Sequence, residues 1–448
     1  MLSPMSIKAT LTKTDLSMIV VSFVIGIGIF RTPAIVAQKA GSPELFYAAW
    51  ILGGLISICG ALTFAEIGSR FPVAGGFYKI FSACYHPVFA FMMNWSLVII
   101  NSFSAVGVAL VGAEYITPVI FPPEMHSQIY VQLIALLMIL ILFALNYAGI
   151  KTGARAQNIL SGIKIVMILF FSSAVLFSHP SALPVQHSIV SSGSFIAILG
   201  ISLISVFFTY GGYQNTMNLG ADVKEPQRTI PASIFTGMGI VMGLYLLINF
   251  AYVHVLGFQH VQQSKLLAAE LASSFLGEAG YKITSVVIFI SVMGFINTSL
   301  MSNPRIYYAM ADDGILPEIF KRVNEKTQVQ QFALSFFTAL MILGLIWLGT
   351  FEKIVNYVMF IDSFSMVTAA ATIFIFRKRM KNTNYKGFRL KLYPWIPLVF
   401  MAMLLTVTYN VFISDVNAAI TGLCIFAAGF PLYLVLKRLT KSTIQPSR

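Results

Sequence analysis

Long apolar stretches, separated by short polar segments, make up almost the whole chain. A membrane-spanning helix needs about 20 mainly apolar residues, and twelve stretches meet that requirement. They cover residues 16–39, 44–69, 88–117, 129–149, 158–178, 195–219, 231–257, 281–303, 331–349, 354–376, 394–413 and 417–436. Residues 258–280 mix polar and apolar positions instead, which predicts a short helical lid outside the membrane. The pattern therefore predicts an all-α polytopic membrane protein with twelve transmembrane helices.

Composition leads to the same class of protein. Hydrophobic residues make up 57% of the chain and charged residues only 10%, and the mean hydropathy is +0.82. These values exclude a soluble globular protein and a disordered polymer. Residues 1–15 lack a short apolar core followed by a small-residue cleavage site, so we expect no cleaved signal peptide.

The basic residues predict how the helices are oriented. With the N-terminus inside, 23 of the 29 Lys and Arg residues fall in predicted cytoplasmic segments and 5 in predicted outer ones. Cytoplasmic segments near helix ends collect Lys and Arg, so both termini are expected in the cytoplasm. This topology and attraction to anionic membrane lipid account for the net charge of +13. Nucleic acid is therefore not expected as a partner.

Two apolar stretches contain a glycine pair in their middle. Gly26 and Gly28 flank Ile27 in the first stretch, and Gly211 and Gly212 interrupt the sixth. Glycine costs a helix about 1 kcal/mol relative to alanine, so such a pair indicates either a break or a notch for close helix packing. Their corresponding places, five helices apart, favour breaks in two inverted repeats, because many transporters place such breaks at the binding site. We expect one domain over residues 1–448, with repeats at 16–178 and 195–376 and additional helices at 394–436.

Several ordered motifs resemble one transporter family. They are Ile25-Gly26-Ile27-Gly28-Ile29-Phe30, Phe64-Ala65-Glu66-Ile67-Gly68, Pro72 to Tyr78, Phe208 to Tyr213, Val223 to Pro231, and Arg305 with Ala311 to Pro317. They are similar to the amino acid–polyamine–organocation (APC) superfamily of permeases, and within it to the L-type amino acid transporter branch. This resemblance implies a LeuT-like 5+5 inverted repeat with broken helices 1 and 6. It also implies a secondary active amino acid transporter that works by alternating access.

The expected site binds the backbone of an α-amino acid through main-chain groups. Free N–H groups of Gly26, Ile27 and Gly28, at the start of the outer half of helix 1, suit the carboxylate. Carbonyls at the two breaks suit the ammonium. The resemblance further implies that Phe208 closes over the substrate as an aromatic gate; the alternative is a packed core aromatic. The full set of expected substrate-binding residues is Ile25, Gly26, Ile27, Gly28, Phe207, Phe208, Thr209, Tyr210, Gly211 and Tyr213.

Three departures from the family pattern bear on specificity. Ile27 stands where relatives often have serine, Tyr213 stands where they have tryptophan, and Ala221-Asp222 replaces a paired acidic position. No acidic residue is evident around the helix-6 break, so a cationic side chain would lack a partner. We therefore expect exchange of neutral, small or apolar, L-amino acids. The alternatives are proton-coupled symport, or transport of polyamines or cationic amino acids.

Lys164, in the fifth stretch, is the main candidate for coupling. An ionisable residue inside the membrane indicates function by default, although its amine could instead reach the interface along its own side chain. The resemblance implies that a lysine here takes the place of a sodium ion and holds the inner half of helix 1, which predicts transport without sodium. Since burial disfavours its charged form, the amine could also load and release a proton.

Two carboxylates also lie within predicted helices. Glu66 is expected either to pair with Arg70 at the surface or to contact the inner gate, and Asp362 either to line the outer path or to pair locally. With Lys164 and Phe208, Glu66 completes the expected gating and coupling set.

Cofactors and protein partners are not expected. The six His residues form no ligand spacing, the three Cys residues no close pair, and the stretches supply almost no acid, base or metal groups for an enzyme. Animal L-type carriers bond a glycoprotein subunit through a cysteine between helices 3 and 4. Residues 117–127 contain none, so we expect no disulfide-linked heavy chain and a bacterial inner membrane as the location.

Overall fold

The structure, a computed structural model, describes residues 7–176, 195–264, 266–348, 352–380, 385–414 and 416–444. The α-helices are α1 (Lys13–Val24), α2 (Gly28–Ala40), α3 (Pro43–Arg70), α4 (Gly76–Cys84), α5 (Pro87–Ile120), α6 (Gln128–Tyr147), α7 (Ile150–Ser172), α8 (Phe195–Thr209), α9 (Pro226–Leu256), α10 (Phe258–Gln263), α11 (Leu267–Leu276), α12 (Ala279–Ser302), α13 (Pro304–Asp312), α14 (Gln331–Leu348), α15 (Glu352–Arg379), α16 (Trp395–Ser414) and α17 (Val416–Ile444). The 3-10 helices are η1 (Pro123–Met125), η2 (Ser173–Leu176), η3 (Tyr213–Asn218), η4 (Gly220–Asp222) and η5 (Glu318–Lys321). The described part of the chain contains isolated bridges but no strand.

The helices match the predicted stretches in order, but fewer of them qualify alone as membrane spans. Among the described residues, seven helices are long and apolar enough to cross a membrane, or eight when the bent pair α1 and α2 counts as one span. The other four predicted spans correspond to α8, α14, α15 and α16, whose described parts are shorter or more polar. The structure thus supports a polytopic helical protein, and the count of twelve spans stays a prediction.

The first span is broken where its glycines predict. A capping box between Thr12 and Asp15 begins α1, which ends at Val24, and α2 begins at Gly28 after a bend of 46°. The Ile25 N–H still donates to the Val21 carbonyl at 2.7 Å, but the Gly26 N–H turns to the Val24 carbonyl at 2.9 Å. The helical ladder therefore stops within one residue of the first glycine.

The sixth span is also broken, but its second half differs from the predicted continuous stretch. After α8 ends at Thr209, Gly212 takes φ = +117°, which favours glycine. The chain then continues through the 3-10 helices η3 and η4, with the Asn215 N–H donating to the Gly212 carbonyl at 3.0 Å. The apolar stretch at 195–219 did not reveal this change, because hydropathy does not distinguish i→i+3 from i→i+4 hydrogen bonding.

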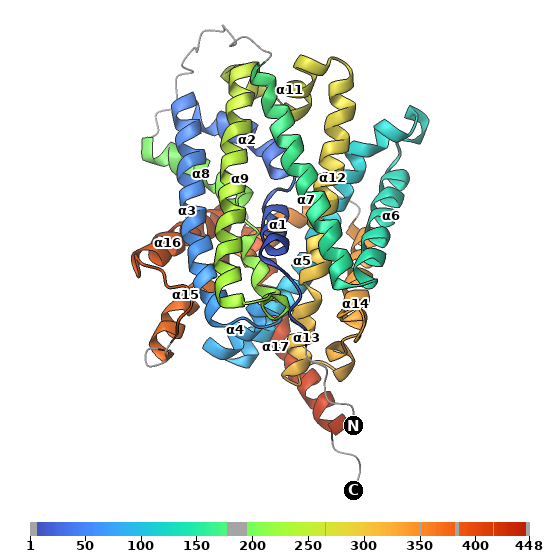
Figure 1. Ribbon diagram of the computed structural model, residues 1–448, viewed down its shortest axis with the longest axis vertical. Helices are drawn as coiled ribbons and strands as arrows, with labels where there is room; N and C mark the ends of the chain where they lie inside the picture. Colours follow the sequence, from blue (N-terminus) through green and yellow to red (C-terminus); the bar gives the residue numbers. More distant parts are fainter. Residues whose placement is uncertain are drawn as a thin grey trace.

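The helices form a bundle with α1 in its interior, packed against α7, α9 and α12 (Figure 1). At the upper end in Figure 1, α10 and α11 confirm the helical part of the predicted lid. Gln262 of α10 donates to the Ala37 carbonyl at 3.1 Å, and Gln38 donates to the Gln262 carbonyl at 2.6 Å. The lid is therefore tied to the outer half of helix 1.

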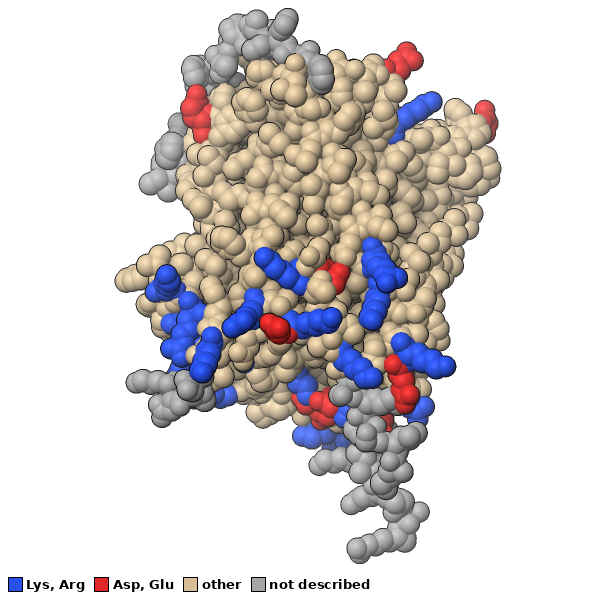
Figure 2. Space-filling model, viewed as in Figure 1, with Lys and Arg blue, Asp and Glu red and all other residues tan. Residues whose placement is uncertain are grey.

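Charged side chains gather at the opposite end. Figure 2 shows Lys and Arg crowded over the lower part of this face, the end where α4 and α13 lie in Figure 1, and an upper part almost free of charge. Lys79 of α4 pairs there with Asp312 at 2.7 Å, and Lys321 pairs with the same carboxylate at 2.7 Å. The hydrogen bond that Lys321 donates to Asp312 raises the pKa of Lys321. This basic end is the predicted cytoplasmic side.

Candidate functional site

The two broken helices meet at their breaks. A methyl group on Gly212 would lie 2.5 Å from the Phe23 carbonyl oxygen, and one on Gly28 would lie 3.1 Å from Thr209 Cγ2. Only glycine allows the approach at Gly212, whereas at Gly28 the Thr209 side chain would have to shift by a few tenths of an ångström. A methyl group on Gly26, in contrast, would have no atom within 4 Å, so this glycine borders open space in the middle of the bundle. The structure therefore brings the two predicted glycine motifs together around a gap.

The expected binding residues divide by exposure. Gly26, Ile27, Gly28, Gly211 and Phe208 are partly exposed, while Ile25, Phe207, Thr209, Tyr210 and Tyr213 are buried. Since the first N–H groups of a helix lack an intrahelical partner, the start of α2 presents donors at the gap. Main-chain donors, a half-exposed aromatic and open space thus occur together.

Two of the expected aromatics pack away from the break. The Phe207 ring lies 5.9 Å from that of Phe400 of α16, and the Tyr213 ring lies 6.3 Å from that of Phe64 of α3. Gly60 makes room for Tyr213, because a methyl group on Gly60 would lie within 2.1 Å of the tyrosine hydroxyl. Phe208 is the half-exposed neighbour and therefore the better candidate for a gate.

Lys164 holds the inner half of helix 1. Its side chain is 1% exposed, and Nζ donates to the Ile25 carbonyl at 2.7 Å and to Ser22 Oγ at 2.9 Å. The alternative that its amine reaches the membrane interface is therefore wrong. The cation caps a carbonyl that the break has freed, as the resemblance implied.

Two further contacts tie α1 to α7 below Lys164. Ser161 Oγ donates to the Met18 carbonyl at 2.8 Å, and Asn158 Nδ2 donates to Asp15 Oδ1 at 2.6 Å. With Lys164, these residues recur every three residues along α7, so one helix face carries all three. We call Asn158, Ser161 and Lys164 the α7 ladder. The sequence singled out only its lysine.

Tyr245 of α9 joins the two breaks and was missed by the sequence analysis. Its hydroxyl lies 2.9 Å from the Val24 carbonyl oxygen and 3.2 Å from the Thr209 carbonyl oxygen, so it can donate its hydrogen bond to either one. The ring packs at 5.0 Å from Tyr210 and at 5.9 Å from Trp50. Nothing distinguishes this residue among 18 tyrosines in the sequence, because no local motif accompanies it.

The expected ammonium acceptors are already engaged in this conformation. The Ile25 carbonyl accepts from Lys164 and the Thr209 carbonyl from Tyr245. The carbonyls of Phe207 and Phe208 accept from the N–H groups of Tyr210 and Gly211. Since a carbonyl oxygen has two lone pairs, each can accept a second hydrogen bond. An ammonium group would therefore share these acceptors with the protein's own donors.

Glu66 is part of a buried network. The carboxylate is fully buried and accepts from Arg70 at 2.7 Å, from Arg377 of α15 at 2.7 and 2.8 Å, and from the Leu390 N–H at 2.7 Å. The expectation of a surface pair is wrong, because two partners more than 300 residues away enclose the side chain. The network joins α3, α15 and the segment before α16.

The N-terminal segment contacts the end of the sixth span at η4. The N–H groups of Thr10 and Leu11 both donate to the Asp222 carbonyl at 2.8 Å. The Asp222 carboxylate is buried and accepts from Arg305 Nε and Nη2 at 3.1 Å each. This bidentate pair compensates the burial of both charges.

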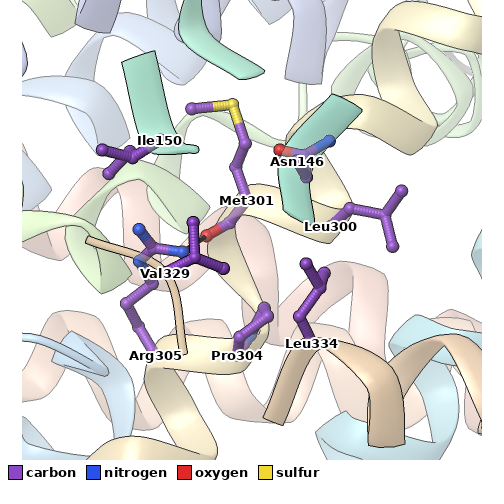
Figure 3. A pocket seen from close by; sticks show the side chains of 8 residues that line it. All are labelled: Asn146, Ile150, Leu300, Met301, Pro304, Arg305, Val329 and Leu334. Atoms are coloured by element: carbon purple, nitrogen blue, oxygen red, sulfur yellow. Dashed lines mark hydrogen bonds between the residues drawn. The ribbon is translucent and has the colours of Figure 1, made fainter. Parts of the chain in front are cut away.

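A cavity of about 10 Å³ near this ion pair is no substrate site. Figure 3 shows its lining side chains: Asn146, Ile150, Leu300, Met301, Pro304, Arg305, Val329 and Leu334. The cavity holds one water molecule at most. From Asn146, hydrogen bonds of 2.7 and 2.8 Å lead through Asn297 to Gln157, beside the α7 ladder.

No metal site is found among the residues with described positions, since no three His, Cys, Asp or Glu side chains lie together there. Cys59, Cys84 and Cys424 are free thiols.

Comparisons with known proteins agree with the motifs. Residues 11–436 match the family model described as amino acid permease. The serine/threonine exchanger SteT of Bacillus subtilis is 28% identical over 94% of this chain and 95% of its own length. The human large neutral amino acids transporter small subunit 2 is 26% identical over 93% of this chain and 78% of its own length. The human cystine/glutamate transporter is 24% identical over 93% and 82%, respectively.

These relatives are transporters rather than enzymes. With a matched region that covers nearly the whole chain and a bundle of apolar helices, the protein is a multi-pass membrane protein. The chain belongs to the amino acid permease family of the APC superfamily, in the branch of the L-type amino acid transporters.

Proposed function

We propose that this protein exchanges neutral L-amino acids across a membrane by alternating access, without sodium. The observation that carries this proposal is the meeting of two broken helices around open space at Gly26, with Lys164 holding a carbonyl of the first break. Both family relatives named for neutral substrates, the serine/threonine exchanger and the large neutral amino acids transporter, support the substrate class.

The site would bind the amino acid by its backbone. N–H groups of Ile27 and Gly28 receive the carboxylate, and that of Gly26 joins them when it leaves the Val24 carbonyl. The positive end of the α2 dipole adds to their attraction. Carbonyls at Ile25 and along Phe207 to Tyr210 receive the ammonium, and Phe208 closes over the substrate. Ile27 adds bulk and no hydroxyl beside the substrate, which favours small or apolar side chains.

Lys164 supports sodium independence. An ammonium at 2.7 Å from the Ile25 carbonyl supplies the positive charge and the donor that a bound sodium ion would otherwise supply at the break. Because its bonds go to main-chain carbonyls and a serine, they can be exchanged for others when the inner half of helix 1 moves. Proton coupling through the same amine is the competing mode.

The finer features of the architecture belong to the same proposal. We infer twelve spans in a single domain over 1–448, with LeuT-like repeats at 16–178 and 195–376 and two further helices at 394–436. Both termini lie in the cytoplasm and the protein resides in a bacterial inner membrane. It acts without a disulfide-linked heavy chain, without a cofactor and without enzymatic activity; Glu66 stabilises the cytoplasmic side near the gate.

Transport by the purified full chain in proteoliposomes tests the proposal. Vesicles loaded with unlabelled L-serine, L-leucine or L-arginine, or left empty, receive labelled L-serine outside in sodium or choline buffer. We expect internal L-serine or L-leucine to raise uptake by about tenfold or more over empty vesicles, equally in both buffers, and L-arginine to have little effect.

Equal uptake into loaded and empty vesicles would contradict exchange. Uptake that requires sodium would contradict the role of Lys164. Uptake driven by an inward proton gradient into empty vesicles would favour proton symport, and stimulation by arginine alone would favour a cationic carrier.

A further inference from the structure

Asp362 of α15 lines a small cavity between α15 and η3, which forms the second half of the broken sixth span. The cavity measures about 10 Å³, and its lining comes from α4, α5, η3, α13 and α15: Phe77, Leu97, Asn101, Asn215, Asn218, Ile306, Asp362, Ser365 and Met366. Asp362 is ten residues into α15, within the predicted span at 354–376. No local pair is found for Asp362 among the described residues, and a place on the outer path stays a prediction.

The Asp362 carboxylate has no hydrogen bond and no ion pair to any residue whose position is described. Asp362 is partly exposed, whereas two buried carboxylates are paired: Glu66 with Arg70 and Arg377, and Asp222 with Arg305. An isolated carboxylate charge in such surroundings is very costly. The neutral, protonated acid is therefore the form that this cavity accommodates.

No lining residue offers a counter-charge. The charged residues next to the lining residues in sequence form ion pairs elsewhere, and the neighbouring tyrosines carry no charge. Lys79 pairs with Asp312 and Asp313, Arg305 with Asp222, and Arg377 with Glu66. The Tyr78 and Tyr307 side chains are buried with unpaired hydroxyl groups. Asp362 is thus the one titrating group among the residues that line this cavity.

The cavity can also accept a hydrogen bond from the protonated acid. Asn101 donates its amide to Asn303 at 2.9 Å, which leaves its carbonyl oxygen available, and the side chain of Asn215 has no bonding partner in the described structure. Asn218 already accepts from the Phe77 N–H and donates to Ser302. A protonated carboxyl group has one O–H donor, for which these amide oxygens are acceptors.

The same turn of α15 contacts the helix-6 break. Met366, one turn after Asp362, accepts a hydrogen bond from Gln214 Nε2 at 3.6 Å. Gln214 Oε1 in turn accepts from the Gly212 N–H at 2.9 Å. A change of charge at Asp362 therefore occurs one turn from the contact between Met366 and Gln214, and Gln214 in turn holds the Gly212 N–H.

We propose that Asp362 is a proton-binding site that controls how firmly η3, in the second half of helix 6, is held against α15 during exchange. This inference rests on the proposed function for its consequence in transport. The described arrangement, in which η3 contacts α15 beside this small cavity, requires the neutral acid. A deprotonated Asp362 attracts water, loosens the contact between η3 and α15, and slows passage through this conformation.

The size of the cavity favours a proton over a metal ion. About 10 Å³ is close to the least volume that holds one water molecule, so a hydrated ion does not fit. Sodium binding at Asp362 would therefore overturn the proposal.

Infrared difference spectroscopy of the purified full chain in detergent tests the site without any transport. Spectra of wild type, Asp362→Asn and Glu114→Gln are recorded as the pH is lowered stepwise. Glu114 is an exposed carboxylate of α5 and serves as the matched control. Besides the bands of the other carboxylates, which all three proteins share, we expect a carboxylic acid C=O component that grows as the pH falls, persists in Glu114→Gln and is lost in Asp362→Asn.

A spectrum of Asp362→Asn that equals that of wild type would overturn the proposal, and so would a sodium-induced change that depends on Asp362. If Asp362→Asn is not recovered as a monodisperse protein, Asp362→Glu gives the same reading, because the band must then shift in frequency. The spectra remain informative even if wild type exchanges no amino acid, so the two proposals fail separately.

Proteoliposomes test the consequence for exchange. Wild-type L-serine exchange should become faster as the pH falls, whereas Asp362→Asn, which mimics the protonated acid, should vary by less than about twofold over the same range. The same pH dependence in Asp362→Asn as in wild type would contradict the control of η3 by this site.

Discussion

The two broken helices are held in different ways. At the first break both halves are α-helical, and the inner half is attached through side chains of the α7 ladder to main-chain carbonyls and one carboxylate. At the second break the chain passes into 3-10 helices, and the segment is fixed by close contact at Gly212 and by the buried Asp222–Arg305 pair. The comparison indicates that the inner half of helix 1 is the part that detaches, while helix 6 is the more rigid support.

Tyr245 is the one described side chain that touches main-chain carbonyls of both breaks, at Val24 and Thr209. Its hydroxyl belongs to neither mode of attachment. Because it bonds carbonyls on both breaks, Tyr245 couples the inner half of helix 1 to helix 6.

The largest effect is expected for Gly212→Ala. Its φ of +117° strains any other residue, and the new methyl group would lie 2.5 Å from the Phe23 carbonyl oxygen. Strain of this kind costs about 1–3 kcal/mol before the clash is added. We expect little monodisperse protein and no exchange, measured by gel filtration and proteoliposome uptake. Gly243→Ala in α9, where a methyl group has open space, is the control; wild-type behaviour of Gly212→Ala would show that helix 6 is not held rigidly.

Lys164→Met should have the next largest effect. The change keeps the length of the side chain but removes three donated hydrogen bonds. A hydrogen bond from a charged group contributes about 1.5–3 kcal/mol, so exchange should fall by about 10- to 100-fold at unchanged protein yield. Uptake assays in sodium and choline buffers measure the exchange rate and its dependence on sodium. A normal rate with unchanged ion dependence would remove Lys164 from the mechanism.

Tyr245→Phe should have a moderate effect. Loss of one hydroxyl removes about 1 kcal/mol, which corresponds to a roughly fivefold lower maximal exchange rate. Tyr252→Phe on the same helix is a matched control, since the buried Tyr252 hydroxyl has no hydrogen-bond partner in the described structure. Equal rates for the two variants would mean that Tyr245 does not couple the breaks.

The smallest effect is expected for Ser161→Ala. One neutral hydrogen bond to the Met18 carbonyl contributes about 0.5–1.5 kcal/mol, so the inner half of helix 1 should detach more often. We expect faster thiol labelling of Ser17→Cys, in a chain without its three native cysteines, by a small membrane-permeant maleimide. A labelling rate that Ser161→Ala leaves unchanged would limit the attachment to Lys164.

Part of this arrangement could be predicted from the sequence, because the residues that indicate it lie together in short segments. The glycines of both breaks and the charge of Lys164 are visible in short segments, and the structure bears out the breaks and the contact with helix 1. Tyr245 carries no such signal, since its role depends on carbonyls 36 and 221 residues away. For the same reason the sequence indicates Arg70 as a partner of Glu66 but neither Arg377 nor Leu390, which join it only through the fold.

The central claim is that the space at Gly26 is where the amino acid binds. A methyl group there meets no atom within 4 Å, so Gly26→Ala should leave the thermal unfolding of the purified protein unchanged. Gly162→Ala, with equally open space on α7, is the control. We predict that Gly26→Ala lowers L-serine exchange by about tenfold or more while Gly162→Ala exchanges like wild type. Normal exchange by a stable Gly26→Ala protein would contradict the claim.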